Sequence, residues 1–278
     1  MPLAKLGDVE LYYEETGVGF PLVWSHEFGG DCRSWEPQVR YFSRRYRVIT
    51  YNHRGYAPSS VPREARAYSQ DILVGDLDRL LRHLGLTEVH LGGCSMGANV
   101  ARDFAIAHPA VTRSLIMVGA GAGSVNREQF LAGQATTAER LEREGMASRL
   151  ESFATLPTRS SFRAKDPRGF AEFIRYAGEH DAQACAHLAR EVMSKRRTVP
   201  EVEAGLRALR VPTLIMVGDL DAPCVEPSLM MRAMIPHAGL VVFPACGHTP
   251  NLEEPDPFNR HVAEFLAAVE AGRWAGRS

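Results

Sequence analysis

Short apolar runs alternate with longer amphipathic segments along most of the chain. Runs with the length and character of strands lie at 22–26, 46–52, 87–92, 114–118, 211–217 and 239–243. Segments with apolar residues at helical spacing lie at 34–45, 69–84 and 98–107. Residues 3–6 and 9–14 flank Gly7-Asp8 and predict an opening antiparallel hairpin. The alternation predicts an α/β fold with a mostly parallel central sheet and helices on both faces.

One long insertion interrupts this pattern. From about 124 to 209 the chain is charged and helical and lacks the strand runs seen elsewhere. We therefore expect a core built from 1–123 and 210–278, with a helical cap at 124–209 that covers a functional site. Apolar residues of this segment can pack the cap or line a pocket. They are Phe130, Leu131, Met146, Leu150, Phe153, Leu156, Phe162, Phe170, Phe173, Ile174, Tyr176, Leu188 and Met193.

The pentapeptide Gly93-Cys94-Ser95-Met96-Gly97 lies directly between the strand-like run 87–92 and the helix-like run 98–107. A tight strand-to-helix reversal holds its serine in a strained backbone conformation, and the glycines leave room for neighbouring backbone. The motif therefore predicts Ser95 as a nucleophile, with the following amide N–H free to bind an oxyanion. Because adjacent side chains point in different directions at a turn, we expect Cys94 to face the packed interior.

Two further candidate groups follow predicted strands. Gly218-Asp219-Leu220-Asp221 follows the run 211–217, and Gly247-His248 follows the run 239–243. Functional groups of open parallel sheets collect at the carboxyl ends of the strands. A serine, a carboxylate and a histidine brought together there can act as nucleophile, orienting acid and general base. Asp219 and Asp221 are both candidates for the acid.

Together these motifs resemble the α/β-hydrolase fold serine hydrolases, from about Val9 to about Val269. Besides the pentapeptide, the resemblance rests on Pro21-Leu22-Val23-Trp24-Ser25-His26, Phe28-Gly29-Gly30, Ser34-Trp35-Glu36-Pro37-Gln38, Arg54-Gly55-Tyr56 and Gly247-His248-Thr249-Pro250-Asn251-Leu252-Glu253-Glu254-Pro255. It implies a catalytic triad of Ser95, Asp221 and His248. Asp221 is preferred because family members place the acid three residues after the strand-ending glycine, which leaves Asp219 as a turn residue.

The resemblance also implies an oxyanion hole formed by the backbone amides of Phe28 and Met96. This chain departs from the family at Glu27, where glycine is usual, so Glu27 must adopt an ordinary backbone conformation or store strain. In one interpretation Glu27, together with His26, borders the substrate pocket, where it disfavours anionic substrates or binds a donor group or water. In the other, Glu27 points outward and pairs with an arginine such as Arg54.

Three functions fit the resemblance. The first is a serine hydrolase that cleaves a small-molecule carboxylic ester or lactone through an acyl-enzyme, which is carboxylic ester hydrolase chemistry. The second is a carbon–carbon bond hydrolase of ring-cleavage products, which are enol or diketo acids. The third is a non-hydrolytic ligand-binding protein or cofactor-free oxygenase of the same fold. The serine at the centre of the pentapeptide, Ser95, argues against epoxide hydrolases and haloalkane dehalogenases, which carry an aspartate at this position.

Basic residues concentrate in one part of the expected cap. A solvated helix face is one explanation. The other is that one of these residues recognises a substrate carboxylate, as acid-recognising hydrolases and enol-lactonases of this fold do. The candidates are Arg159, Arg163, Lys165, Arg168 and Arg175.

Composition and charge mainly exclude some classes of partner and cofactor. The 278 residues carry a net charge of -1, with 45% hydrophobic and 23% charged residues, which is ordinary for a globular enzyme and gives no general attraction to nucleic acid or anionic membrane. No run of about 18 apolar residues is present, and we expect a cytoplasmic protein with a small-molecule substrate. The five cysteines lack metal-type spacing. We expect no metal and no cofactor, and read the Gly119–Gly123 stretch as a flexible exit from the sheet.

Overall fold

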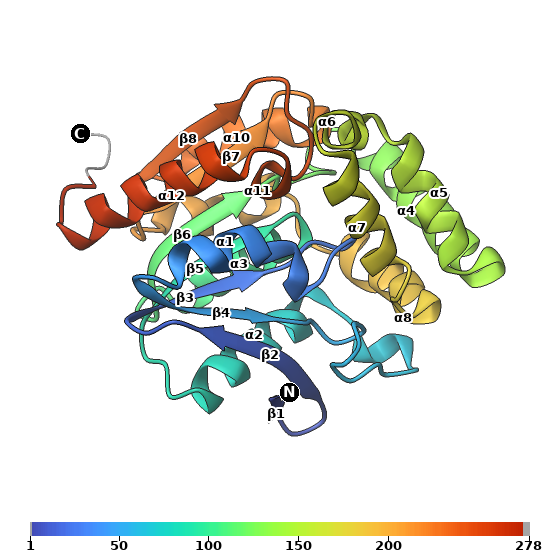
Figure 1. Cartoon of the computed structure of the whole chain (residues 1–278), viewed down its shortest axis with the longest axis horizontal. Coiled ribbons are helices and arrows are strands. Elements are labelled where there is room, and N and C mark those ends of the chain that lie inside the picture. The colour runs from blue at the N-terminus through green and yellow to red at the C-terminus, as the bar shows by residue number, and fades with distance from the viewer. Residues whose placement is uncertain (1, 275–278) are drawn as a thin grey trace.

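The computed structural model describes residues 2–274, which form a mixed eight-stranded sheet flanked by helices (Figure 1). The strand order is β1-β2-β4-β3-β5-β6-β7-β8. The strands are β1 (Leu3–Lys5), β2 (Glu10–Thr16), β3 (Phe20–Ser25), β4 (Tyr46–Tyr51), β5 (Val89–Cys94), β6 (Thr112–Val118), β7 (Thr213–Gly218) and β8 (Ala238–Phe243). The β1–β2 and β2–β4 pairs are antiparallel, and every other pair is parallel. The predicted fold class is confirmed.

Central strands are buried along their whole length because helices cover both of their faces. All six residues of β5 and all six of β7 are buried. One face packs against α2 (Gln70–His83), α3 (Met96–Ala107) and α10 (Ala222–Met234), and the opposite face packs against α1 (Glu36–Phe42) and α12 (Pro255–Glu270). On the second face Trp24 stacks on Trp35 with ring centroids 4.4 Å apart. Such two-sided burial fixes the strand ends that carry the candidate site residues.

The segment between β6 and β7, called the insertion below, is helical. Its helices are α4 (Arg127–Glu144), α5 (Met146–Thr155), α6 (Pro157–Lys165), α7 (Pro167–Ala177), α8 (Ala182–His187) and α9 (Glu203–Ala208), with a π-helical turn at Leu188–Met193. Figure 1 shows α4 to α8 gathered at one end of the sheet. Phe153, Phe162, Phe170 and Phe173 form an aromatic core within it. The proposed division at 124 and 209 remains a prediction.

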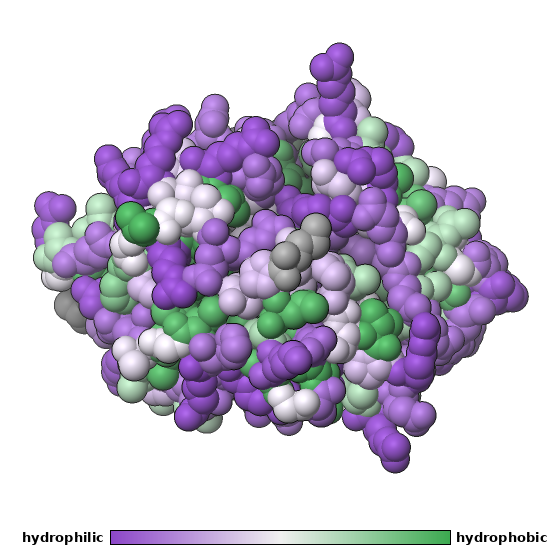
Figure 2. Space-filling view, turned by 60° about the horizontal axis from the view of Figure 1, so that its bottom comes forward, coloured by the Kyte–Doolittle hydropathy of each residue, from purple (hydrophilic) through white to green (hydrophobic). Residues whose placement is uncertain are grey.

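The surface carries scattered apolar side chains. Figure 2 shows a mainly hydrophilic face on which hydrophobic residues form small separate patches. Large exposed hydrophobic residues are Leu3, Val18, Tyr41, Val125, Leu131, Leu220, Leu229 and Val242. Within residues 2–274, no helix has the length and hydropathy needed to span a membrane.

A buried ion pair ties the loop after β4 to helix α2. Arg54 donates from Nε to Oδ2 of Asp76 at 2.6 Å and from Nη2 to Oδ1 at 2.8 Å. Arg54 is 1% exposed and Asp76 is fully buried. Arg79 also donates to Asp76. Removing one partner of a buried pair leaves an uncompensated charge, so this contact makes α2 sensitive to substitution.

Replacing Asp76 with asparagine should lower the free energy of unfolding by about 3 kcal/mol, because the buried charge of Arg54 is then offset only by the exposed Asp8, whose Oδ2 lies 3.3 Å from Nη2. Thermal and denaturant melts of the purified protein measure the change. Asp78→Asn in the same helix is the control: Asp78 pairs with the exposed Arg82, and its loss should cost less than about 1 kcal/mol. Equal losses of stability in the two variants would show that the buried ion pair stabilises the fold no more than the exposed one.

Candidate active site

Ser95 occupies the turn between β5 and α3 in a conformation that L-residues rarely adopt. Its backbone φ is 53° and its ψ is -109°. The turn is so tight that a Cβ on Gly93 would lie 2.4 Å from the Gly97 carbonyl oxygen, and one on Gly97 would lie 2.2 Å from the Ser25 carbonyl oxygen. The amide of Ser95 donates to the carbonyl of Val118 at 2.8 Å, which fixes the turn to β6. Both glycines of the motif are therefore required by close backbone approach.

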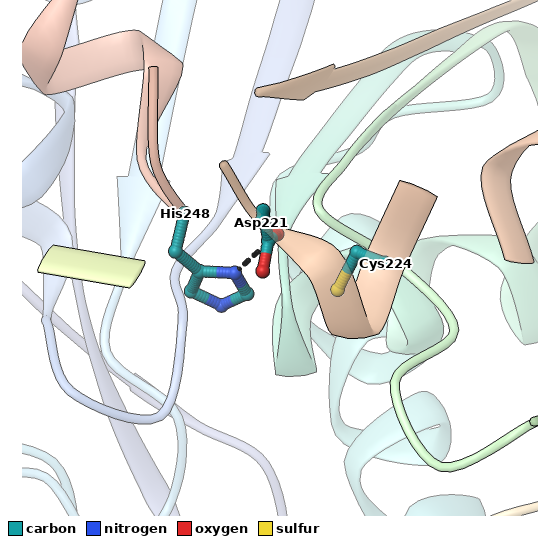
Figure 3. A group of neighbouring side chains, drawn as sticks. All are labelled: Asp221, Cys224 and His248. Atoms are coloured by element: carbon teal, nitrogen blue, oxygen red, sulfur yellow. Dashed lines mark hydrogen bonds and ion pairs between the residues drawn. The ribbon is translucent and has the colours of Figure 1, made fainter. Parts of the chain in front are cut away.

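His248 and Asp221 form a hydrogen-bonded pair at the ends of β8 and β7. The His248 Nδ1 lies 2.7 Å from Oδ2 of Asp221 (Figure 3). Burial lowers the pKa of His248, but the Asp221 carboxylate more than offsets this and raises that pKa above its usual value. With the Nδ1 proton held by the carboxylate, the neutral ring has Nε2 as its acceptor. Asp219 lies outside this pair: it is exposed, and its Oδ1 accepts a hydrogen bond from the Cys246 amide at 3.2 Å.

The loop after β3 brings Phe28 to the cavity that Ser95 and His248 also line. His26 holds this loop: its Nε2 accepts the His53 amide at 3.0 Å, so its Nδ1 carries the proton donated to the Glu27 carbonyl at 2.7 Å. Burial lowers the pKa of His26 to about 4, which keeps the ring neutral. Within residues 2–274, the amides of Phe28 and Met96 donate no hydrogen bond to another protein group. Neither amide is therefore engaged by another group of the described chain.

Glu27 is buried and forms an ion pair with Arg159 from helix α6. Each residue is 3% exposed, and the guanidinium of Arg159 also donates to Thr249 Oγ1 at 2.9 Å. The interpretation that Glu27 points outward to Arg54 is therefore wrong, because the insertion supplies a nearer cation and Arg54 is held by Asp76. Glu27 also has no positive φ, so its backbone is ordinary at this family position.

The electrostatic environment of Glu27 follows from this pair. Burial raises the pKa of the Glu27 carboxyl, but the Arg159 charge outweighs burial and the pKa lies below its usual value. One carboxylate oxygen, Oε1, is buried without a hydrogen-bond partner in the structure. Glu27 is therefore an ionised group, and most of its charge is offset by Arg159 rather than by solvent.

Ser95, His248 and Asp221 line one cavity of about 170 Å³. Its remaining walls are Glu27, Phe28, Gly29, Ala122, Phe130, Gln134, Arg149, Phe153, Leu156, Thr158, Arg159, Met193, Pro223 and Cys224. Four apolar residues expected in the cap, Phe130, Phe153, Leu156 and Met193, are thus wall residues. His26 is not a wall residue, because its ring is turned into the loop's own hydrogen bonds. A larger groove of about 500 Å³ beside α1 and α7 contains none of the three chemical groups, so it is not assigned as the site.

Sequence reasoning did not single out Arg149, which enters this cavity from α5. Its signal was the spacing to Phe153, four residues on, which places both side chains on one helix face. Among the basic candidates only Arg159 reaches the cavity. The other four, Arg163, Lys165, Arg168 and Arg175, are exposed, as expected of a solvated face.

One group of possible metal ligands occurs among the described residues, and it overlaps the hydrogen-bonded pair. Ligand atoms of Asp221, Cys224 and His248 lie within 4.8 Å of one another (Figure 3). The Cys224 thiol lies 3.2 Å from the Gly119 carbonyl, and burial together with the Asp221 charge raises the pKa of this thiol well above its usual value. A protonated thiol and an engaged Nδ1 suit an acid–histidine pair better than a metal. The absence of a metal remains a prediction.

Known proteins share this architecture over most of its length. The family model described as the alpha/beta hydrolase fold matches residues 21–255. A candidate carbamate hydrolase of Azorhizobium caulinodans is 28% identical over 97% of this chain and 100% of its own. A 2-hydroxy-6-oxononadienedioate/2-hydroxy-6-oxononatrienedioate hydrolase of Pseudomonas putida is 27% identical over 93% of this chain and 92% of its own.

A solved structure has the same fold. The thermophilic esterase of Thermogutta terrifontis, determined with malate bound, superposes with a TM-score of 0.84 and 31% identity over 94% of each chain. The match thus includes the core strands and the insertion. With the family model over most of its length and this relative over nearly all of it, the chain belongs to the α/β-hydrolase family.

Proposed function

We propose that the protein is a serine hydrolase that cleaves a small-molecule carboxylic ester or lactone through an acyl-enzyme. The observation that carries this proposal is the placement of a strained Ser95 in one cavity with the hydrogen-bonded pair of His248 and Asp221. Strained backbone at such a turn costs about 1–3 kcal/mol and is retained where it aims a functional side chain. No cofactor is required by this chemistry.

In the acylation step, Ser95 Oγ attacks the substrate carbonyl carbon while His248 Nε2 takes the hydroxyl proton. Asp221 holds the imidazole through Nδ1 and stabilises the imidazolium that forms. The carbonyl oxygen becomes an oxyanion that accepts hydrogen bonds from the Phe28 and Met96 amides. Collapse of the tetrahedral intermediate transfers the proton to the leaving alkoxide and leaves an ester between substrate and Ser95.

The second half of the reaction repeats these roles with water. His248 removes a proton from water as the water oxygen attacks the acyl carbon, and the same amides hold the second oxyanion. The proton then passes to Ser95 Oγ as the acyl–oxygen bond breaks. A carboxylic acid leaves, and the starting protonation state is restored.

Contacts of α6 support the assignment of 124–209 as a cap that helps to form the site. The His248 amide donates to the Thr158 carbonyl at 3.0 Å. Ser161 donates to Oε2 of Glu253 at 2.6 Å, and this oxygen also accepts the Gly247 amide at 2.9 Å. The insertion is therefore bonded directly to the loop that carries the histidine, so it contributes to the histidine position as well as to the cavity wall.

The second candidate is hydrolysis of a carbon–carbon bond in an acidic ring-cleavage product. Two observations favour it: the Pseudomonas putida relative is named for such a hydrolase, and two arginines line the cavity. A ligand-binding or oxygenase role is the third candidate, and it predicts binding without turnover of activated esters. The small-molecule substrate class and the cytoplasmic location both stay predictions.

Ser95→Ala should abolish both labelling by a fluorophosphonate probe and hydrolysis of p-nitrophenyl esters, because it removes the attacking oxygen. We expect kcat to fall by roughly 10⁵- to 10⁶-fold. A chain-length series of esters measured on the intact enzyme then defines the pocket. Labelling of the intact enzyme without ester turnover would favour the carbon–carbon substrates, and absence of both would favour the non-hydrolytic role.

Asp221→Asn should lower kcat by roughly 10³- to 10⁴-fold, because an amide favours the wrong imidazole tautomer and cannot stabilise the imidazolium. Steady-state kinetics with one activated ester measure the effect. Asp219→Asn is the matched control, since Asp219 is exposed and only caps the Cys246 amide. The assignment of the acid is wrong if the Asp219 variant loses more activity than the Asp221 variant.

Activity should fall toward acid as His248 becomes protonated, with a midpoint in kcat/KM above 6.5 because the Asp221 charge outweighs burial and raises this pKa. Among the remaining neighbours, Arg159 lowers the pKa of His248 and Glu27 raises it. Glu27→Gln should therefore move the midpoint to lower pH, since it removes the negative charge and leaves Arg159 uncompensated. Glu151→Gln, on the exposed face of α5, should leave the midpoint unchanged. A shift to higher pH in Glu27→Gln would contradict this account.

A further inference from the structure

We propose that Arg149 binds a carboxylate carried by the substrate, so that the enzyme prefers acidic esters or lactones to neutral ones. The inference rests on the proposed hydrolase function and names the substrate class of that site. It assigns to α5 a specificity role that differs from the role of Arg159 on α6.

Arg149 is positioned by aromatic rings at the cavity wall. Its guanidinium carbon lies 4.1 Å from the ring centroid of Phe153 and 5.0 Å from that of Phe28. Phe28 is also the residue whose amide is proposed as an oxyanion donor, so the cation lies against a residue of the proposed reaction site. Stacking on aromatic rings fixes the guanidinium plane without consuming its N–H donors.

Unlike its neighbours, Arg149 has no anionic partner within residues 2–274. Arg140 and Arg143, in the preceding helix α4, each pair with Glu144 at the surface. The Nε of Arg149 is buried and makes no hydrogen bond to the protein. A buried donor without an acceptor costs free energy, so a ligand oxygen placed there would recover that cost.

The charge of Arg149 persists at neutral pH. Burial lowers its pKa to about 10, and the nearby Arg159 charge contributes in the same direction. The cavity wall carries two carboxylates, Glu27 and Asp221, and these are bonded to Arg159 and His248 respectively. Glu27 and Arg159 therefore offset each other, and Arg149 remains the cation available to a substrate.

The chemistry of the cavity narrows the ligand. A planar guanidinium binds a carboxylate through two parallel hydrogen bonds. Phe130, Leu156 and Met193 give the cavity apolar wall, and Gln134 and Thr158 are polar members of it. A volume of about 170 Å³ is small for an enzyme pocket and favours a short substrate. The expected substrate is thus a small ester or lactone that carries one carboxylate a few carbons from the scissile bond.

The test compares acidic and neutral esters of matched shape. Monomethyl glutarate against methyl pentanoate places the carboxylate on the acyl side, and 4-acetoxybenzoate against its methyl ester places it on the alcohol side. For each pair of esters, the ratio of kcat/KM for the acidic ester to kcat/KM for the neutral ester is measured in wild type, Arg149→Met and Arg149→Lys. Because the ratio is taken within each variant, a general loss of activity or stability cancels.

For one of the two ester pairs, Arg149→Met should lower the ratio of acidic to neutral kcat/KM by roughly 10- to 100-fold, the loss expected for a hydrogen bond to a charged group. The ratio for Arg149→Lys should lie between those of wild type and Arg149→Met, because lysine keeps the positive charge but cannot donate two parallel hydrogen bonds from a planar group. Arg168→Met, which removes an exposed arginine of α7, should leave both ratios unchanged. Equal losses on acidic and neutral esters in Arg149→Met would overturn the proposal.

A binding measurement separates this inference from the proposed reaction. Calorimetric titration of the Ser95→Ala protein with glutarate, and with neutral glutaramide as control, requires no turnover. Glutarate binding that weakens at least roughly 10-fold in Ser95→Ala/Arg149→Met supports the carboxylate site even if wild type hydrolyses none of the esters, in which case only the reaction is misassigned. If there is no ester turnover, glutarate binding that is absent or independent of Arg149 sinks the inference.

Discussion

The backbone reversal at Ser95 is the constraint around which the site is assembled. With φ at 53°, the serine can be held only if the chains on both sides come unusually close, and the glycines at 93 and 97 permit this approach. The carbonyl of Ser25 then lies against the first turn of α3, which places the end of β3 beside the turn. The strain that aims the hydroxyl thus also determines where the Phe28 amide can lie.

A second constraint is the buried ion pair between Glu27 and Arg159. It joins segments 132 residues apart and connects the loop after β3 to a helix of the insertion. The two buried charges are tolerated because each offsets the other. Removing one would leave the other unpaired in the low-dielectric interior. The pair also leaves Arg149 without a carboxylate partner, so its guanidinium is the charged group of the cavity wall that is free to bind an anionic guest.

Sequence was informative where the signal is local. The strands of the sheet, the glycine-flanked turn and the strand-end positions of Asp221 and His248 follow from periodicity and short motifs, and the structure brings Asp221 and His248 within 2.7 Å. The suggested partner of Glu27, Arg54, was wrong because the actual partner, Arg159, comes from a helix whose docking no local pattern encodes, whereas the alternative that placed Glu27 beside the pocket agrees with its position in the cavity wall. His26 was expected near the pocket by its position in the chain, but the preference of its two ring nitrogens for backbone partners turned it into the loop.

An acyl-enzyme on Ser95 can be detected by mass spectrometry of the enzyme quenched during turnover of an activated ester at low pH, where deacylation by His248 is slowed. We expect a mass increase equal to the acyl group, mapped by peptide sequencing to Ser95 and reversed when the pH is raised. An acyl group found on another residue, or steady ester turnover with no adduct on Ser95 at any pH, would contradict the central claim.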